Sequence, residues 1–228
     1  MGYIRFHHAY TSLIFLMLFL LLLPILFILF ASSITIAFSR LGIPPFIAYF
    51  LFWLSLIGSA INIPIKKWRS EIEEIGEINF FGIRYRIPFY GQRETMLAIN
   101  FGGAIIPVSV ATYEFIRLSN QPEIIMEAIL AIVIVAAVCK MLARPIRGLG
   151  ISIPAFIPPL IAAITAIITA RQNPVVVAYL AGTLGTLIGA DLLNIHKIKE
   201  LNAPVASIGG AGTFDGIFLS GIIAVLLV

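Results

Sequence analysis

Asp191 and Asp215 are the two aspartates of this 228-residue chain, and both lie inside strongly apolar segments. An ionisable side chain in the middle of a bilayer costs roughly 2.5–3.5 kcal/mol, so such residues usually mark pathways or catalytic sites. Two carboxylates held close together in a low dielectric cannot both ionise, and the pair then shares one proton. Such a pair catalyses hydrolysis when one carboxylate activates water while the other protonates the carbonyl or amine group. The two aspartates are therefore the predicted catalytic residues.

The same two carboxylates also suit other roles. A secondary transporter with broken helices binds and releases a proton or Na⁺ at such groups, and an aspartate can also cap a broken helix. The direction of Asp191 stays open, because a stripe of small residues lies roughly opposite it on an ideal helix: Gly182, Gly185 and Gly189. Either this stripe packs on another helix while Asp191 faces the last span, or the helix is broken near Gly189.

The composition places both aspartates in a membrane protein. Hydrophobic residues make up 60% of the chain and charged residues 11%, with a mean hydropathy of +1.05. Soluble domains are typically about a quarter charged, and disorder requires low hydrophobicity with high charge, so both classes are excluded. The net charge of +4 is too small and too scattered for a nucleic-acid surface. The lone cysteine, Cys139, excludes an internal disulfide and a Cys-rich metal site.

Hydropathy and turn residues predict an all-α fold, a polytopic transmembrane helical bundle that forms one integral membrane domain over residues 1–228. A span needs about 20 apolar residues, and we place seven, at Leu13–Phe38, Pro44–Ile63, Thr95–Ile116, Glu123–Leu142, Ile153–Ala170, Pro174–Asn194 and Ile208–Val228. Pro24 is expected to kink the first span. Asp191 lies near the cytoplasmic end of span six, and Asp215 lies about two turns into span seven from the same side. Adjacent helices joined by a short loop pack together, so the two carboxylates are expected to face one another.

The basic residues predict the orientation of this integral cell-membrane protein. Twelve of the fifteen Lys and Arg residues fall on the N-terminal tail and the second, fourth and sixth loops, and three fall on the other loops. The positive-inside rule therefore places the N-terminus in the cytoplasm and the C-terminus outside.

The second loop, residues 65–94, is long and cytoplasmic in this topology. Its charged start predicts a short surface helix over Lys66–Glu77. Apolar and basic residues then alternate over Ile83–Ile87, which predicts a small β-hairpin with Ile78–Phe81 between spans two and three. This hairpin would either offer an edge to an extended peptide or lie as a ribbon at the membrane interface, with its arginines at lipid phosphates.

Polar and small residues near the depth of the aspartates are the candidate substrate-binding or supporting residues: Asn100, Gly102, Gly103, Gly189, Gly212, Thr213 and Gly216. Asn100 either bonds a substrate or orients an aspartate, or it joins helices through a hydrogen bond worth under about 2 kcal/mol. Three glutamates near the outer ends of spans three and four are interpreted as solvated at the interface: Glu114, Glu123 and Glu127. The sequence lacks metal-ligand spacing, Ser-His or Cys-His pairing and a phosphate-binding glycine loop, so no metal or cofactor is predicted.

Three runs are long enough to be specific: Asn100–Pro107 (NFGGAIIP), Gly182–Asn194 (GTLGTLIGADLLN) and Ile208–Leu219 (IGGAGTFDGIFL). Together they resemble an uncharacterised prokaryotic membrane-protein family, the domain of unknown function 1614. The resemblance covers the chain from about Ile78 to the C-terminus. It implies a shared fold and supplies no activity.

A weaker resemblance is to the presenilin and signal-peptide-peptidase group of intramembrane aspartyl proteases. That group places one Asp in a sixth span and one in a seventh, the latter within Gly-x-Gly-Asp near the cytoplasmic side, and Asp191 and Asp215 match this placement. This sequence departs from the group in two ways. Thr213–Phe214 separate the Gly210–Gly212 run from Asp215. The Pro-Ala-Leu motif of the group is absent, and a loosely similar run, Ile153–Phe156 (IPAF), lies in an earlier span. The resemblance implies a protease whose substrate is a transmembrane peptide, in contact with membrane lipid.

Two alternatives remain open. The first is a transporter coupled to protons or Na⁺ through the same carboxylates, whose partner would be a small cation. The second is a non-catalytic membrane scaffold in which the glycine stripes serve packing. Many transporters contain an inverted repeat, and its absence between the two halves of this sequence disfavours transport. No nucleic-acid partner is expected, and the oligomeric state stays open.

Overall fold

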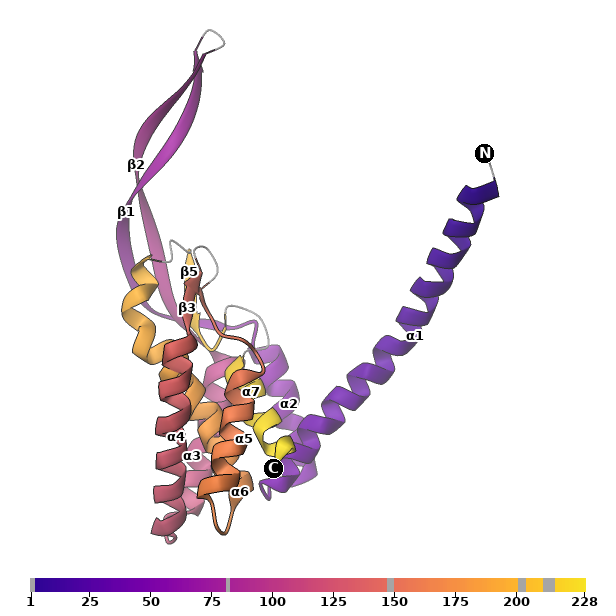
Figure 1. Cartoon of the computed structure of the whole chain (residues 1–228), viewed down its shortest axis with the longest axis vertical. Coiled ribbons are helices and arrows are strands. Elements are labelled where there is room, and N and C mark those ends of the chain that lie inside the picture. The colour runs from indigo at the N-terminus through magenta and orange to yellow at the C-terminus, as the bar shows by residue number, and fades with distance from the viewer. Residues whose placement is uncertain (1–2, 81–82, 147–149, 201–203, 211–215) are drawn as a thin grey trace. The chain divides into compact units, whose positions relative to one another are not determined.

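The computed structural model describes residues 3–80, 83–146, 150–200, 204–210 and 216–228. The chain divides into two compact units, Met1–Phe52 and Trp53–Val228, which we describe separately. Most of the described residues are helical, and strands occur in the second unit (Figure 1). The strands are more extensive than the small hairpin that the sequence predicts in an otherwise all-α fold.

The first unit contains one long helix and most of a second. Helix α1 spans Tyr3–Arg40, and its Leu13–Arg40 part is long and apolar enough to cross a membrane. The helix continues past Pro24 as one element. A turn with a φ of +83° at Gly42 leads to α2, Pro45–Gly58, and the Phe52 ring of α2 lies 6.0 Å from that of Phe27 on α1 between centroids.

The second unit begins with a long two-stranded ribbon (Figure 1). Strand β1 spans Asn62–Phe80 and pairs antiparallel with β2, Ile83–Asn100, from Asn62 opposite Asn100 to Phe80 opposite Ile83. The predicted surface helix over Lys66–Glu77 is therefore wrong. Strand formation depends on the partner that a segment finds across the sheet more than on its local sequence, and here β2 supplies that partner along the whole segment.

A third strand joins the ribbon from the far end of the sequence. Strand β5, Val205–Ile208, pairs with Met96–Ile99 of β2 in parallel, which gives the sheet order β1-β2-β5. Two predicted spans consequently begin as strands. Span three was expected to start at Thr95, but β2 runs to Asn100 before the chain turns helical, and span seven was expected to start at Ile208, which closes β5.

The helices of the second unit form a bundle below this sheet in Figure 1. The π-helical turn Phe101–Ile105 follows β2 and leads into α3, Ile106–Arg117. The remaining helices are α4, Pro122–Leu142; α5, Ile157–Thr169; α6, Pro174–Leu180, with its continuation to Glu200; and α7, Gly216–Leu227. A small sheet of β3, Arg144–Ile146, and β4, Gly150–Ser152, joins α4 to α5.

Small buried side chains let these helices approach closely. Helix α4 packs on α5 and on the continuation of α6, and α7 packs on α5 and α6. The buried alanines of α4 and α5 are Ala128, Ala131, Ala136, Ala162, Ala163 and Ala166. Close approach through small residues is the usual way in which helices associate in membranes.

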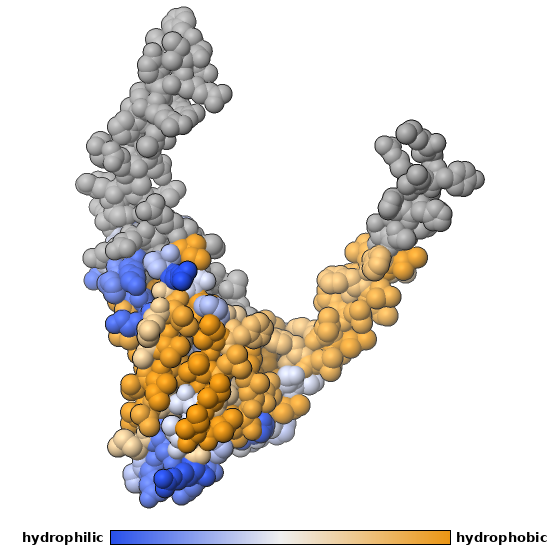
Figure 2. Space-filling view, in the orientation of Figure 1, coloured by the Kyte–Doolittle hydropathy of each residue, from blue (hydrophilic) through white to orange (hydrophobic). Residues whose placement is uncertain are grey.

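Three helices in the described part of the chain are long and apolar enough to cross a membrane: Leu13–Arg40, Pro122–Leu142 and Pro174–Lys197. The apolar helices Pro45–Gly58, Ile157–Thr169 and Gly216–Leu227 are shorter, so the count of seven spans stays a prediction. In Figure 2 the visible flank of the bundle is apolar, and hydrophilic residues gather at its two ends. We call these the sheet end, where β2 and β5 finish, and the turn end, where α3 passes into α4 and α5 into α6.

Candidate functional site

The segment that carries Asp191 is helical but irregular. After α6 the chain forms two π-helical turns, Ala181–Gly185 and Leu187–Asp191, and then a 3₁₀ helix, Leu192–Glu200. Turns of this kind inside a helix occur frequently at functional sites. Asp191 is the last residue of the second π-helical turn, so it lies where the helix changes its winding.

The glycine stripe in this segment explains how it packs. A Cβ atom on Gly185 would lie 2.7 Å from Val135 of α4, and one on Gly189 would contact the Ala136 carbonyl of the same helix. A Cβ atom on Gly182 would lie 2.8 Å from the Ser220 carbonyl of α7. The stripe therefore packs on neighbouring helices, as the first alternative predicts for it, and the winding of the helix is irregular from Ala181 onwards.

The Asp191 carboxylate is held at the turn that follows β5. Its Oδ2 atom accepts a hydrogen bond from the backbone N–H of Gly209 at 3.0 Å, and the residue is half-buried. Gly209 and Gly210 have φ values of +83° and +86°, in the left-handed region that favours glycine. A Cβ atom on Gly209 would also lie 2.6 Å from Ala104. Two requirements thus favour glycine at the position that binds Asp191.

Asn100 performs a similar task at the end of β2. Its Nδ2 atom donates to the Ser59 carbonyl at 2.6 Å and to Asn62 Oδ1 at 3.0 Å, and its Oδ1 atom accepts from the Gly103 N–H at 2.7 Å. The residue is 0% exposed. Asn100 therefore caps the π-helical turn and ties it to the segment after α2, which is the structural role that the sequence left open.

Gly102 and Gly103 are both buried beside Asn100. A Cβ atom on Gly102 would contact the backbone of Ser55 and Ser59 in α2 and the following turn. Ser55 completes this contact, because its Oγ atom donates to the Gly102 carbonyl at 2.6 Å.

Several predicted site residues are thus brought together at the sheet end of the bundle. Gly209 joins Asp191 to the Asn100–Ala104 segment, since it bonds the first and contacts the second. Gly189 lies two residues before Asp191 and contacts α4 instead. Asp215, Gly212 and Thr213 lie outside the described residues, and with them the expected approach of the two carboxylates. Gly216, the first residue of α7, is exposed, with open space where its Cβ would be.

An apolar groove of about 550 Å³ borders the site. Its walls come from α3 and from the sequence neighbours of the site, and they include Ala104, Val108, Thr112, Leu187, Leu192 and Ile208. The Thr112 hydroxyl donates to the Val108 carbonyl of its own helix at 2.9 Å, and Ser109, also in the wall, donates to Ile105 at 2.7 Å. These hydroxyls therefore add little polarity to the groove, which suits a hydrocarbon occupant.

Sequence reasoning missed a set of buried polar residues in the bundle core: Glu114, Cys139, Tyr179, Thr183, Thr186 and Ser220. The interpretation of Glu114 as an interfacial, solvated residue is wrong, because it is 0% exposed and its Oε2 atom lies 2.8 Å from Arg117. Packing against α6 and α7 buries it, and this packing is not visible in a single sequence. The available signal was an arginine three residues after a glutamate in an apolar span, which is the spacing of a helical ion pair.

Within the described ranges, no group of three or more His, Cys, Asp or Glu side chains is placed to hold a metal ion. The geometry at the sheet end thus offers a carboxylate, backbone N–H groups and an apolar groove.

Fold and site together define a mostly helical protein with helices long enough to cross a membrane and a polar site at the end of one of them. The chain belongs to the family described as "Protein of unknown function (DUF1614)", whose model matches residues 56–227. No curated protein and no solved structure matches the chain. The matched range contains the ribbon, the groove and the described site residues.

Proposed function

We propose that this protein is an intramembrane aspartyl-type hydrolase in which Asp191 and Asp215 share one proton and cleave a membrane-embedded peptide. The supporting observation is the hydrogen bond from the Gly209 N–H to the Asp191 carboxylate. It holds Asp191 at the start of the glycine-rich run that leads to Asp215, six residues further along the chain.

In this proposal the ionised carboxylate removes a proton from a water molecule, and the hydroxide adds to the carbonyl carbon of the peptide. The protonated partner donates its proton to the carbonyl oxygen. The tetrahedral intermediate then collapses: the carboxyl group that took the proton from water gives it to the amine nitrogen, the C–N bond breaks, and the partner carboxylate takes back a hydroxyl proton. The apolar groove next to Asp191 would hold the hydrophobic segment of the substrate.

The test compares Asp191→Asn and Asp215→Asn with wild type on a panel of single-span peptides in liposomes. We expect each substitution to abolish cleavage and the double variant to lose little more, because residues that act as a unit are not additive. Glu123→Gln is the matched control, because Glu123 is an exposed carboxylate in the first turn of α4. A hydroxyl-bearing mimic of the transition state should bind wild type tightly. Wild-type protein that neither binds the mimic nor cleaves any peptide would end this proposal.

One observation favours a transporter as a second candidate. The helical segment Pro174–Glu200 changes from α-helix to π-helix and then to 3₁₀ helix around Asp191. Discontinuous helices form the ion and substrate sites of many secondary transporters. This candidate predicts that Asp191→Asn abolishes uptake driven by Na⁺ or protons in liposomes while no peptide is ever cut.

Both candidates share the proposed topology, with the N-terminus and the sheet end of the bundle in the cytoplasm. A reporter fused after Val228 should then be extracellular, and one inserted near Arg69 should be cytoplasmic. Finding both reporters on the same side would refute a count of seven spans.

A further inference from the structure

Polar side chains form a buried line along the helical segment that ends at Asp191. Tyr179, Thr183 and Thr186 follow one another at helical spacing, and each is buried. The Tyr179 hydroxyl donates to the Pro107 carbonyl of α3 at 3.2 Å. A Cβ atom on Gly221 of α7 would contact both the Thr183 hydroxyl and the Tyr179 ring, so these two side chains lie side by side.

The line continues towards Asp191 through α7 and α4. Thr186 Oγ1 donates to Ser220 Oγ at 3.1 Å, and Cys139 Sγ lies 4.0 Å from Thr186 Oγ1. The Cβ atom of Cys139 lies beside Gly189, whose carbonyl accepts a hydrogen bond from the Asn194 side chain at 3.0 Å. Asn194 Nδ2 also donates to the Ala190 carbonyl, next to Asp191.

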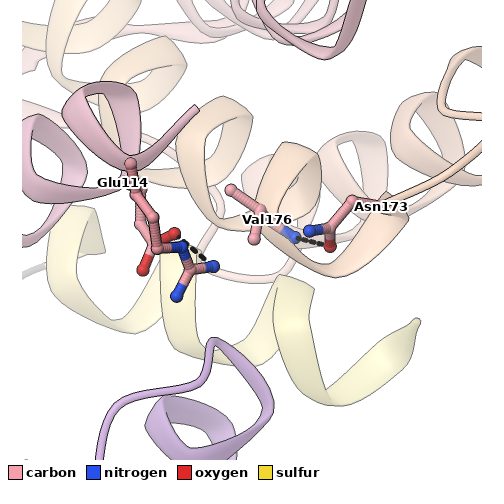
Figure 3. A network of polar contacts seen from close by, with 4 residues as sticks. Glu114, Asn173 and Val176 are labelled. Atoms are coloured by element: carbon pink, nitrogen blue, oxygen red, sulfur yellow. Dashed lines mark hydrogen bonds and ion pairs between the residues drawn. The ribbon is translucent and has the colours of Figure 1, made fainter. Parts of the chain in front are cut away.

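Glu114 occupies the other end of the line. It lies in the last turns of α3, which packs on α6, the helix that carries Tyr179. Figure 3 shows Glu114 near the start of α6, where the Asn173 side chain caps the helix by accepting from the Val176 N–H. The line thus begins at the turn end of the bundle and reaches the sheet end. At no more than the α-helical rise of 1.5 Å per residue, the 12 steps from Tyr179 to Asp191 cover at most about 18 Å, roughly half of the hydrocarbon core of a bilayer.

This line also contains most of the unsatisfied polar atoms in the described part of the chain. Five buried side-chain oxygens there lack a hydrogen-bond partner of good geometry, and four of them belong to the line: Glu114 Oε1, Glu114 Oε2, Thr183 Oγ1 and Asn194 Oδ1. The fifth belongs to Glu127. Glu114 Oε2 is nevertheless ion-paired with Arg117 at 2.8 Å, and the Thr183 hydroxyl interacts with that of Tyr179. An unsatisfied buried polar atom in a native structure calls for an explanation, and ordered water is a common one.

We propose that this line is a hydrated proton path that connects Glu114 at the turn end with Asp191 at the sheet end. Hydroxyl groups and water both accept and donate hydrogen bonds, so a proton can pass along them. Each O–H bond that breaks is replaced by one that forms on the next oxygen. Glu114 takes up or releases the proton at one end, with Arg117 beside it, and Asp191 does so at the other.

The inference shares Asp191 with the proposed function but rests on other residues, and it is tested without a peptide. Wild-type protein is reconstituted in vesicles with a trapped pH-sensitive dye, and a potassium gradient with valinomycin drives proton entry. We expect a proton flux at least tenfold above that of protein-free vesicles. Wild-type vesicles with no flux above that background would overturn the path, whatever the peptide-cleavage result.

Variants locate the path. Glu114→Gln and Thr183→Val should each lower the flux at least tenfold, because the first removes the exchangeable carboxyl proton and the second the hydroxyl in the middle of the line. Thr183→Ser keeps the hydroxyl and should restore the flux to within threefold of wild type, which separates the proton path from a folding defect. Glu123→Gln, at an exposed position in the first turn of α4, should leave the flux within twofold.

Three results would contradict the proposal. A wild-type flux in Glu114→Gln and Thr183→Val would show that protons do not use this line. A flux that Thr183→Ser fails to restore, although the variant melts like wild type, would remove the role of the hydroxyl. Entry of Na⁺ without protons, measured with a trapped Na⁺ dye, would replace a proton path by a cation path. Peptide cleavage measured on the same preparations reports on the hydrolase proposal separately.

Discussion

Strands β2 and β5 end side by side and in the same direction, and each passes into a turn that contains two consecutive glycines. At the end of β2, a neutral amide from the strand itself organises the turn, because Asn100 bonds three groups and is wholly buried. At the end of β5, a carboxylate from another helical segment does so, because Asp191 binds the Gly209 N–H while remaining half-buried. The two turns therefore differ in backbone, which is helical after Asn100 and left-handed at Gly209 and Gly210, and in the charge of the side chain that caps them.

The difference indicates which of the two positions is structural. An amide carries both donors and acceptors, so Asn100 can satisfy several buried groups without introducing a charge. A carboxylate only accepts when ionised, and its removal from water costs more than that of an amide. A fold that required only a cap at Gly209 would be served by an asparagine there too. The presence of an aspartate at this point is consistent with the chemical role that we propose for Asp191.

The largest expected effect is that of Gly102→Ala at the end of β2. The new Cβ atom would overlap the backbone of Ser55 and Ser59, which cannot rotate away. We expect a loss of about 3 kcal/mol or more in the free energy of unfolding, measured as thermal unfolding in detergent. Gly216→Ala is the control, since its Cβ atom would meet open space, and it should be neutral or stabilising by up to about 1 kcal/mol. Equal melting temperatures for the two variants would contradict the packing described at Gly102.

Asn100→Ala should follow, with a loss of about 2–4 kcal/mol. The substitution leaves the Ser59 carbonyl and the Gly103 N–H without the Asn100 side chain in a buried place, and each unsatisfied group costs about 1–3 kcal/mol. The free energy of unfolding in detergent measures this loss. If Asn100→Ala lowers the free energy of unfolding by less than about 1 kcal/mol, then Asn100, compared with Asp191, is not the structural residue.

Gly209→Ala should cost about 2–3 kcal/mol, from left-handed backbone strain and from contact with Ala104. Gly150→Ala separates the two causes, because Gly150 also has a positive φ, of +133°, but open space around its Cβ position. We expect a loss of about 1–2 kcal/mol there, from backbone strain alone. If both variants melt at the same temperature, crowding by Ala104 contributes nothing.

The smallest expected effect on stability is that of Asp191→Asn, under about 1 kcal/mol. The amide oxygen of the new side chain can still accept the hydrogen bond of the Gly209 N–H, so the turn stays capped. This variant sharpens the comparison, because the turn at Gly209 is then capped by a neutral amide, as Asn100 caps the turn at Gly103. A loss of more than about 2 kcal/mol in the free energy of unfolding would assign Asp191 a structural role in place of a chemical one.

The sequence alone indicated the helical character of the chain, the membrane-length helices and the candidates Asp191 and Asn100, because charge and amide groups in apolar runs stand out. It did not indicate that Thr95–Asn100 and Val205–Ile208 are strands. Both segments are short and apolar, and short apolar runs do not distinguish a buried strand from a helix. Their pairing also joins residues about 110 positions apart, which no local pattern encodes.

The burial of Glu114 was invisible for a related reason. Position in an apolar run gives the depth of a residue but not which neighbours enclose it, and α6 and α7 enclose Glu114 from distant parts of the chain. The hydroxyls of Thr183, Thr186 and Ser220 were overlooked because single Ser and Thr residues are common in helices that cross membranes. They became informative only when packing placed them on one line.

The parallel pairing of β2 with β5 has a consequence for biosynthesis. Met96 is made about 110 residues before its partner Val205, so at 5–20 residues per second the end of β2 waits about 5–20 s for that strand. During this interval α3 to α6 leave the ribosome, and Asp191 has no Gly209 to bind. The site can therefore assemble only after residues 205–209 have been made, and a chain released before then would carry Asp191 without a completed site around it.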